Sequence, residues 1–168
     1  MTRLLVVADT HVPLRAKRLP NEVLELLPAV DVVVHAGDWV DEPTLDLFEE
    51  SSRVLVACWG NNDGSGLRSR LPETARVEVD GIRIAVTHET GPKEGRERRA
   101  DERFPDVDLL IFGHSHIPWD SVAPSGMRLL NPGSPTDRRA QPHASYLVVD
   151  IAAGRIDADL RLIPRRQA

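Results

Sequence analysis

The chain has 168 residues, which is enough for one globular domain with its own hydrophobic core but short for two. Its 41% hydrophobic and 28% charged residues exclude a disordered or fibrous chain. The net charge of −5 argues against a protein that binds the backbone of genomic nucleic acid, because such proteins carry a basic surface.

The cysteine content and the N-terminus indicate a compartment. The one cysteine, Cys58, lies in an apolar run and has no partner for an internal disulfide, which favours a reducing environment. The apolar run that ends at Asp9 is too short for a signal-peptide core or a membrane span. We therefore expect a cytoplasmic protein that does not act at a membrane.

The first third of the chain alternates apolar runs with helical patterns. Residues 3–9, 31–38 and 53–60 are continuous apolar runs, typical of buried strands. Residues 21–30 have apolar side chains at helical spacing, and 41–51 predicts a second helix with acidic residues in its first turn. This β-α-β-α-β order predicts a parallel sheet.

The rest of the chain is richer in hairpins. Residues 75–88 alternate on both sides of Asp80-Gly81, which is a hairpin signal, and 108–114 predicts another buried strand. Residues 119–131 and 144–163 predict two further hairpins. The mixture favours two sheets packed face to face with helices outside.

The segment 91–105 mixes basic and acidic residues. We favour a solvated helix held by ion pairs between residues four apart. The alternative is a basic rim that attracts phosphate over a pocket. Its basic residues are Lys93, Arg96, Arg98, Arg99 and Arg103.

Polar residues gather where the predicted strands end. Ligands bind at the carboxyl ends of strands in parallel α/β sheets, so these side chains are candidates for one site. His35 lies within its strand and is expected to be a core histidine, and Cys58 is expected to pack in the core. The strand-end candidates are Asp9, His11, Asp38, Asn61, Asp63, His88, His114 and His116.

The candidate set has the chemistry of a metal centre. Aspartates, imidazoles and one amide oxygen, without sulfur, suit Mn²⁺, Fe, Zn²⁺ or Ni²⁺ rather than Ca²⁺ or a structural zinc. The seven candidates other than Asp63 are more ligands than one tetrahedral ion can take, but they are a suitable number for two ions that share one carboxylate. Two metals about 3.5–4 Å apart form the clamp of phosphoester hydrolysis, in which a bridging hydroxide attacks phosphorus. Phosphate-binding loops, dinucleotide-binding loops and nucleophile elbows are absent from the sequence.

The order of these motifs resembles the calcineurin-like metallophosphoesterase superfamily. The motifs are Asp9-x-His11, Gly37-Asp38, Gly60-Asn61-x-Asp63, His88 and Gly113-His114-x-His116. The sequence "NPGS" at 131–134 and the short length narrow the resemblance to the small YfcE-type phosphodiesterases. The resemblance implies one domain over residues 1–168, an α/β fold built as a four-layer α-β-β-α sandwich of two mixed sheets.

The resemblance also implies a division of ligands. One metal is expected on Asp9, His11, Asp38 and His116, and the other on Asp38, Asn61, His88 and His114, with Asp38 as the bridge. Asp63 is expected to orient a neighbouring side chain rather than to bind metal.

Two positions depart from the pattern. Many members have a histidine after the ligand asparagine, and YfcE-type members often a cysteine, whereas this chain has Asn62. Because an amide cannot deliver a proton at neutral pH, we expect a modest catalyst that favours good leaving groups. Glu89 follows His88 where relatives often have glycine, so it either supports the second metal site or narrows it. The catalytic candidates are thus Asn62 and Asp63.

The remaining motifs are expected to support the site. Trp39, Trp59 and Trp119 lie near the metal loops, where packing of the pocket wall is favoured over stacking on a base or aryl group. The "NPGS" sequence is expected to form a tight turn that supports the metal loops.

We therefore expect a phosphoesterase that uses two divalent ions, Mn²⁺ first and Ni²⁺, Fe or Zn²⁺ otherwise. The expected substrates are small phosphodiesters such as cyclic nucleotides or dinucleotides, and a homo-oligomer is left open. The alternative is a non-catalytic scaffold like the retromer scaffold subunit, which resembles the same fold, or a nucleotide or metal sensor. The complete ligand set favours the enzyme.

Overall fold

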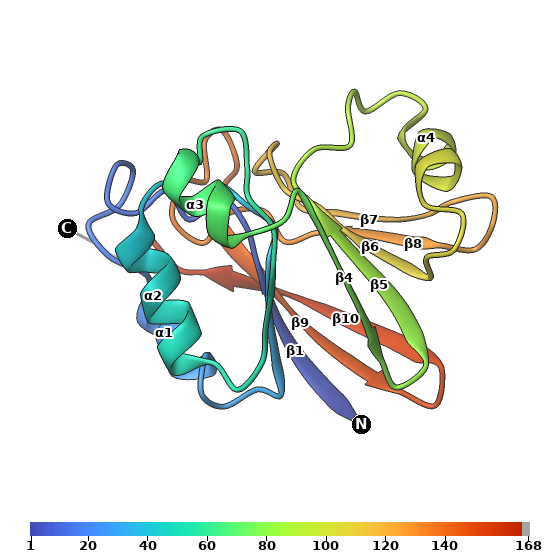
Figure 1. Ribbon diagram of the computed structural model, residues 1–168, viewed down its shortest axis with the longest axis horizontal. Helices are drawn as coiled ribbons and strands as arrows, with labels where there is room; N and C mark the ends of the chain where they lie inside the picture. The colour runs from blue at the N-terminus through green and yellow to red at the C-terminus, as the bar shows by residue number, and fades with distance from the viewer. Residues whose placement is uncertain (166–168) are drawn as a thin grey trace.

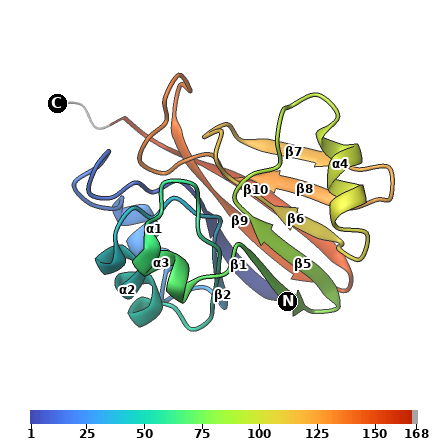
Figure 2. The same cartoon turned by 45° about the horizontal axis from the view of Figure 1, so that its top comes forward.

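Two five-stranded sheets pack face to face in the computed structural model, which describes residues 1–165. Helices cover the outer face of each sheet (Figure 1), and Figure 2 shows the same layers after rotation. This arrangement confirms the predicted α/β fold, a four-layer α-β-β-α sandwich of two mixed sheets. Residues 166–168 of the domain predicted over 1–168 lie outside the described part of the chain.

The first sheet has the strand order β10-β9-β1-β2-β3. Strands β1, β2 and β3 are parallel, and Val7 pairs with His35, which pairs with Ala57, so the carboxyl ends of these strands lie level at one edge. The antiparallel hairpin of β9 and β10 completes the sheet, as predicted for 144–163. The strands are β1 Thr2–Val7, β2 Val32–His35, β3 Leu55–Ala57, β9 Ala144–Ala152 and β10 Arg155–Ile163.

The second sheet has the order β4-β5-β6-β8-β7. Its three inner strands are parallel, and Val86, Ile111 and Leu130 lie in register near their carboxyl ends. The other two predicted hairpins supply the edges, since β4 pairs antiparallel with β5 and β7 with β8. The strands are β4 Thr74–Val79, β5 Ile82–Thr87, β6 Leu109–Ile111, β7 Trp119–Val122 and β8 Arg128–Asn131.

The helices depart from the predictions in two places. Helix α1, Asn21–Leu26, is shorter than the predicted 21–30, because Pro28 lacks the N–H that a continuing helix needs. Helix α3, Ser65–Arg70, is not predicted, since Ser and Gly open it and only its buried Leu67 packs against the first sheet. Helices α2, Glu42–Ser51, and α4, Arg96–Arg103, lie within the predicted segments.

Three apolar clusters correspond to the three boundaries between the layers. Leu4, Val34 and Ile111 belong to the cluster between the sheets, and Cys58 is buried with them, as predicted. Burial raises the pKa of the Cys58 thiol, so it stays a neutral core group. Within residues 1–165, every helix is too short or too polar to cross a membrane.

Candidate metal centre

The candidate ligands meet where the carboxyl ends of both sheets face each other. Asp9 and His11 follow β1, and Asp38 follows β2. The second sheet contributes His88 after β5 and the pair His114 and His116 after β6, while Asn61 follows β3. The structure thus brings together all seven predicted ligands, which contact one another as described below.

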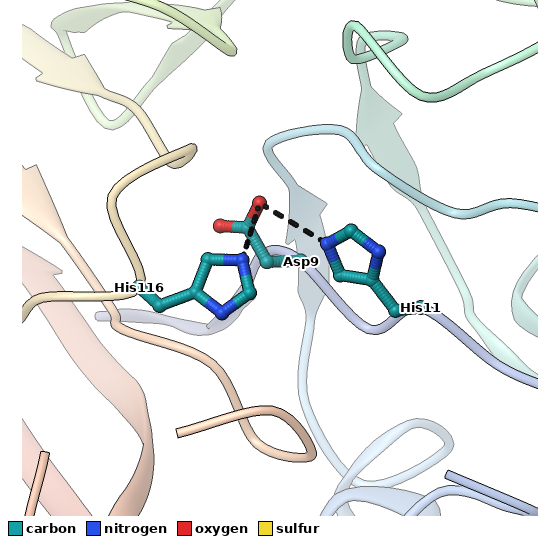
Figure 3. Close-up of side chains that lie close together, drawn as sticks. All are labelled: Asp9, His11 and His116. Carbon is teal, nitrogen blue, oxygen red and sulfur yellow. Dashed lines mark ion pairs between the residues drawn. The ribbon is translucent and has the colours of Figure 1, made fainter. Parts of the chain in front are cut away.

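Asp9, His11 and His116 form the first group (Figure 3). The Asp9 Oδ1 atom lies 3.8 Å from His11 Nε2 and 3.5 Å from His116 Nε2. All three atoms are buried, and none has a hydrogen-bond partner in the part of the chain that is described. Because buried polar atoms are normally paired, three unpaired ones converging on one point fit a cation there.

Hydrogen bonds orient these side chains. The other Asp9 oxygen, Oδ2, accepts the His114 backbone N–H at 2.9 Å, which leaves Oδ1 facing the histidines. The Nδ1 atom of His116 donates to the Asp137 backbone carbonyl, so its Nε2 atom is the one with a free lone pair. Sequence reasoning missed Asp137, because a backbone acceptor has no residue-type signature.

Asp38 lies between the two groups of ligands. Its Oδ2 atom is 3.4 Å from His11 Nε2 and 3.4 Å from His88 Nε2. Asn62 donates to both Asp38 oxygens, from its backbone N–H at 2.9 Å and from its side-chain amide at 2.8 Å. Asp38 is therefore within reach of a histidine from each group.

Asn61, His88 and His114 form the second group. The Asn61 Oδ1 atom lies 2.9 Å from His88 Nε2 and 3.1 Å from His114 Nδ1. His88 donates from Nδ1 to the Ala36 carbonyl at 2.7 Å, which directs Nε2 inward. The Glu89 carboxylate is 3.8 Å from His114 Nδ1, so Glu89 borders this group.

The electrostatics of the centre favour a cation. Burial disfavours the ionised form of Asp9, but the His11 and His116 nitrogens outweigh it and lower the pKa of the Asp9 carboxyl. The pKa of Asp38 is also lowered against its burial, chiefly by His88. Burial lowers the pKa of His88, yet Asp38 and Asp9 together raise it to about 9. Both carboxylates are therefore ionised at neutral pH, and a proton occupies His88 where a metal would displace it.

Asp63 ties the ligand loops together. Its Oδ2 atom accepts the backbone N–H of Asp38 at 3.0 Å and of Gly60 at 2.7 Å. Its Oδ1 atom accepts the Val40 N–H at 2.8 Å. Both oxygens are thus engaged by backbone, which fits the expected orienting role and not contact with substrate.

The ligand loops have a strained backbone. Asp9, Asp38, His114 and His116 have φ angles of 55°, 61°, 72° and 61°, in the left-handed region. Such conformations cost about 1–3 kcal/mol each and persist where surrounding contacts enforce them, often at functional sites. Gly60 is needed for a different reason, since a Cβ there would lie 2.2 Å from the Asp38 Oδ1 atom.

The "NPGS" turn braces the same loops. Asn131 donates from Nδ2 to the Gly113 carbonyl at 3.0 Å, and the Ser134 hydroxyl donates to the Asp9 carbonyl at 2.8 Å. Thr136, just beyond the turn, donates to the Thr10 carbonyl at 2.6 Å. These contacts agree with the supporting role expected from the sequence.

His35 and two of the tryptophans are structural. The His35 ring accepts the Gly37 N–H, contacts the Thr10 hydroxyl and stacks on Trp39 with centroids 3.5 Å apart. Burial lowers the pKa of His35 to about 3, so it is a neutral core histidine, as expected. Trp39 is fully buried, and Trp119 lies under the Arg96 guanidinium at 4.6 Å.

A pocket of about 610 Å³ adjoins the second group of ligands. Asn61, His88 and Glu89 form part of its wall. Trp59, half-buried beneath the Arg68 guanidinium at 4.0 Å, also lines it. The segment 91–105 therefore forms the predicted helix and also borders a pocket, through Arg99 and Arg103.

Curated relatives match most of the chain. "Probable metallophosphoesterase MJ0623" of Methanocaldococcus jannaschii is 37% identical over 78% of this chain and 67% of its own length. A "Probable metallophosphoesterase" of Methanothermobacter thermautotrophicus is 32% identical over 92% of this chain and 89% of its own. "Phosphodiesterase MJ0936" of M. jannaschii is 28% identical over 66% and 71% of the two chains.

Solved structures share the fold. The solution structure of Thermotoga maritima protein TM1076 superposes with a TM-score of 0.78 at 32% identity, covering 97% of this chain and all of the other. Vps29 of Entamoeba histolytica, solved with Zn²⁺, has a TM-score of 0.74 at 23% identity over 95% and 98% of the chains, a likeness that shows the fold alone. The family model of the Calcineurin-like phosphoesterase superfamily domain matches residues 2–154, and the chain belongs to that superfamily.

Proposed function

We propose that the protein is a dinuclear-metal-dependent phosphodiesterase that hydrolyses small diesters. The observation that carries this proposal is the convergence of the buried, unpaired atoms Asp9 Oδ1, His11 Nε2 and His116 Nε2. A phosphodiesterase of M. jannaschii among the relatives supports the reaction class.

The residues divide into two overlapping ligand sets. The first ion would be held by Asp9, His11, Asp38 and His116, and the second by Asp38, Asn61, His88 and His114. Divalent ions held by these residues would polarise the phosphoryl oxygens and lower the pKa of water, which would supply a nucleophile at neutral pH. The nitrogen and oxygen donors suit Mn²⁺, our first expectation, and also Ni²⁺, Fe or Zn²⁺.

The chain's own groups orient the centre but do not protonate a leaving group. Asn62 holds Asp38 through two hydrogen bonds and has no acidic proton to donate. The enzyme should therefore prefer ester groups that leave as stable anions. The Glu89 carboxylate borders the second group and adds one negative charge there.

The competing function is a non-catalytic scaffold or sensor. The Vps29 likeness is compatible with a scaffold on this fold, and Asn62 in place of a proton donor is compatible with a sensor. A scaffold, however, does not require a full set of inward-facing metal ligands. We therefore place the enzyme first.

The deciding experiment compares bis-p-nitrophenyl phosphate with p-nitrophenyl phosphate. Protein stripped by a chelator is assayed alone and after addition of Mn²⁺, Ni²⁺, Zn²⁺ or Mg²⁺, with bound metal measured in each sample. Asp38→Ala is the test variant, and Asp41→Ala, which removes the N-cap of α2, is the control. Diester cleavage that returns with metal and is lost only in Asp38→Ala supports the proposal. No cleavage of either ester by metal-loaded protein refutes it and favours the scaffold or sensor.

A further inference from the structure

The pocket beside the metal centre is positioned to receive part of a bound ester. Asn61 and His88 belong both to its wall and to the second group of ligands. A phosphoryl group held at the centre therefore has the pocket next to it. The volume of about 610 Å³ lies within the usual range for small-molecule sites.

The floor of the pocket is apolar. The buried residues Ala100 of α4, Phe104 just after it and Leu110 of β6 underlie the pocket. The half-buried Trp59 and the exposed Pro92 supply apolar surface that a ligand can reach. The indole of Trp59 adds a flat aromatic surface to the wall. Apolar and aromatic surfaces of this kind bind a planar ring well, because a ring buries a large area without losing conformational freedom.

The polar wall is preorganised. Arg99 donates to the backbone carbonyls of Thr90, Pro92 and Glu94. Arg103 donates to the Glu89 carbonyl at 3.0 Å and to a threonine hydroxyl at the end of β5. These bonds fix the segment between β5 and α4, which projects beyond the ends of the strands (Figure 1).

The charges of the wall argue against a second phosphate as the occupant. Arg99 and Arg103 contribute two positive charges, but the carboxylates of Glu73 and Glu89 line the same pocket. The guanidinium groups are also already engaged by oxygen acceptors. A wall of balanced charge with hydrogen-bonding groups suits an uncharged ring with polar edges better than an anion.

We propose that this pocket holds a planar ring, aryl or nucleobase, carried by the phosphoester whose phosphoryl group binds at the metal centre. The assignment deepens the proposed function and rests on it, because the metal ligands place the phosphoryl group. It makes the pocket a determinant of substrate class, in addition to the preference of the centre for ester groups that leave as stable anions.

The test measures ligand binding and includes phosphonates, whose P–C bond is not an ester, so that it does not depend on turnover. Binding of phenylphosphonate and methylphosphonate to Mn²⁺-loaded protein is measured by calorimetry, together with adenosine 5′-monophosphate and ribose 5-phosphate. Thr90→Trp and Glu73→Trp fill the pocket from two parts of its wall, and Thr90 keeps the backbone carbonyl that Arg99 uses. Val122→Trp, at an exposed position outside the pocket, is the matched control.

We expect the protein to prefer the ring-bearing member of at least one pair by about tenfold or more. Both pocket variants should abolish that preference, and Val122→Trp should keep it. The pair that shows the preference distinguishes an aryl ring from a nucleobase. Equal binding within both pairs, a preference that survives in both pocket variants, or no phosphonate or phosphate binding at all would overturn the assignment. A ring preference without cleavage of bis-p-nitrophenyl phosphate would support the pocket while refuting the phosphodiesterase.

Discussion

Asp63→Asn tests whether the metal centre depends on a residue that does not face it. The carboxylate accepts three backbone N–H groups, from Asp38, Val40 and Gly60, at 2.7–3.0 Å. Asparagine keeps one acceptor oxygen and turns the other into a donor, so at least one N–H loses its partner. Hydrogen bonds to charged groups contribute about 1.5–3 kcal/mol each, and neutral ones about 0.5–1.5. The variant should therefore lose about 2–4 kcal/mol of unfolding free energy.

The same change should weaken metal binding. Asp63 fixes the backbone of Asp38 and of Gly60, which precedes Asn61, so its loss lets two ligands shift. Loss of a residue that orients metal ligands in this way typically lowers the metal affinity about 10–100-fold. Urea unfolding of protein stripped of metal by a chelator measures the free energy of unfolding, and calorimetric titration with Mn²⁺ measures the metal affinity.

Asp41→Ala is the matched control. Asp41 accepts the Thr44 N–H at 3.0 Å as the N-cap of α2, so its loss should cost about 1 kcal/mol of stability. It should leave the Mn²⁺ affinity unchanged. If Asp63→Asn lowers stability as expected but binds Mn²⁺ like the wild type, Asp63 is only a structural tie and the reasoning fails.

The remaining predictions concern separate groups. Asn62→His supplies a proton donor and should raise turnover of diesters with poor leaving groups, up to about 10²-fold; unchanged turnover with metals bound would contradict this. His35 has a pKa of about 3 in the folded protein against 6.5 ordinarily. Its neutral form is thus favoured by folding, and stability is complete above pH 6.5 and falls by about 1.4 kcal/mol per pH unit below it. Between pH 7.5 and pH 5, the unfolding free energy measured in urea should therefore fall by about 2 kcal/mol less in His35→Asn than in the wild type. An equal fall in both proteins would refute the lowered pKa of His35. Arg99→Lys cannot span the carbonyls of Thr90 and Glu94, so it should weaken phenylphosphonate binding several-fold, about 3–10 times, without changing that of methylphosphonate. Equal weakening of both phosphonates would show that Arg99 acts on the metal centre instead.

The sequence by itself determined the strand positions and the residue types at their ends. Continuous apolar runs defined the buried strands, and Asp80-Gly81, with φ angles of 46° and 80°, defined one hairpin. Both signals depend on neighbouring residues only, so no distant contact was needed to interpret them. Helix α3 has no such local signal, because its stability comes from packing of Leu67 and not from its own helix propensity.

Only the tertiary structure decided how each of these polar residues is oriented and which atoms it contacts. The backbone N–H that orients Asp9 belongs to His114, which lies 105 residues further along the chain. The two residues meet because the two sheets face each other. The same packing buries His35 beside Trp39 while it leaves His11 with an unpaired nitrogen, although both histidines lie near strand ends. The pocket beside the metal centre also arises from packing, since α4 places Ala100, and Phe104 just after it, beside Leu110 of β6. Local pattern fixes which residues a strand carries to its end, whereas burial and the partners of each polar atom depend on contacts between distant segments.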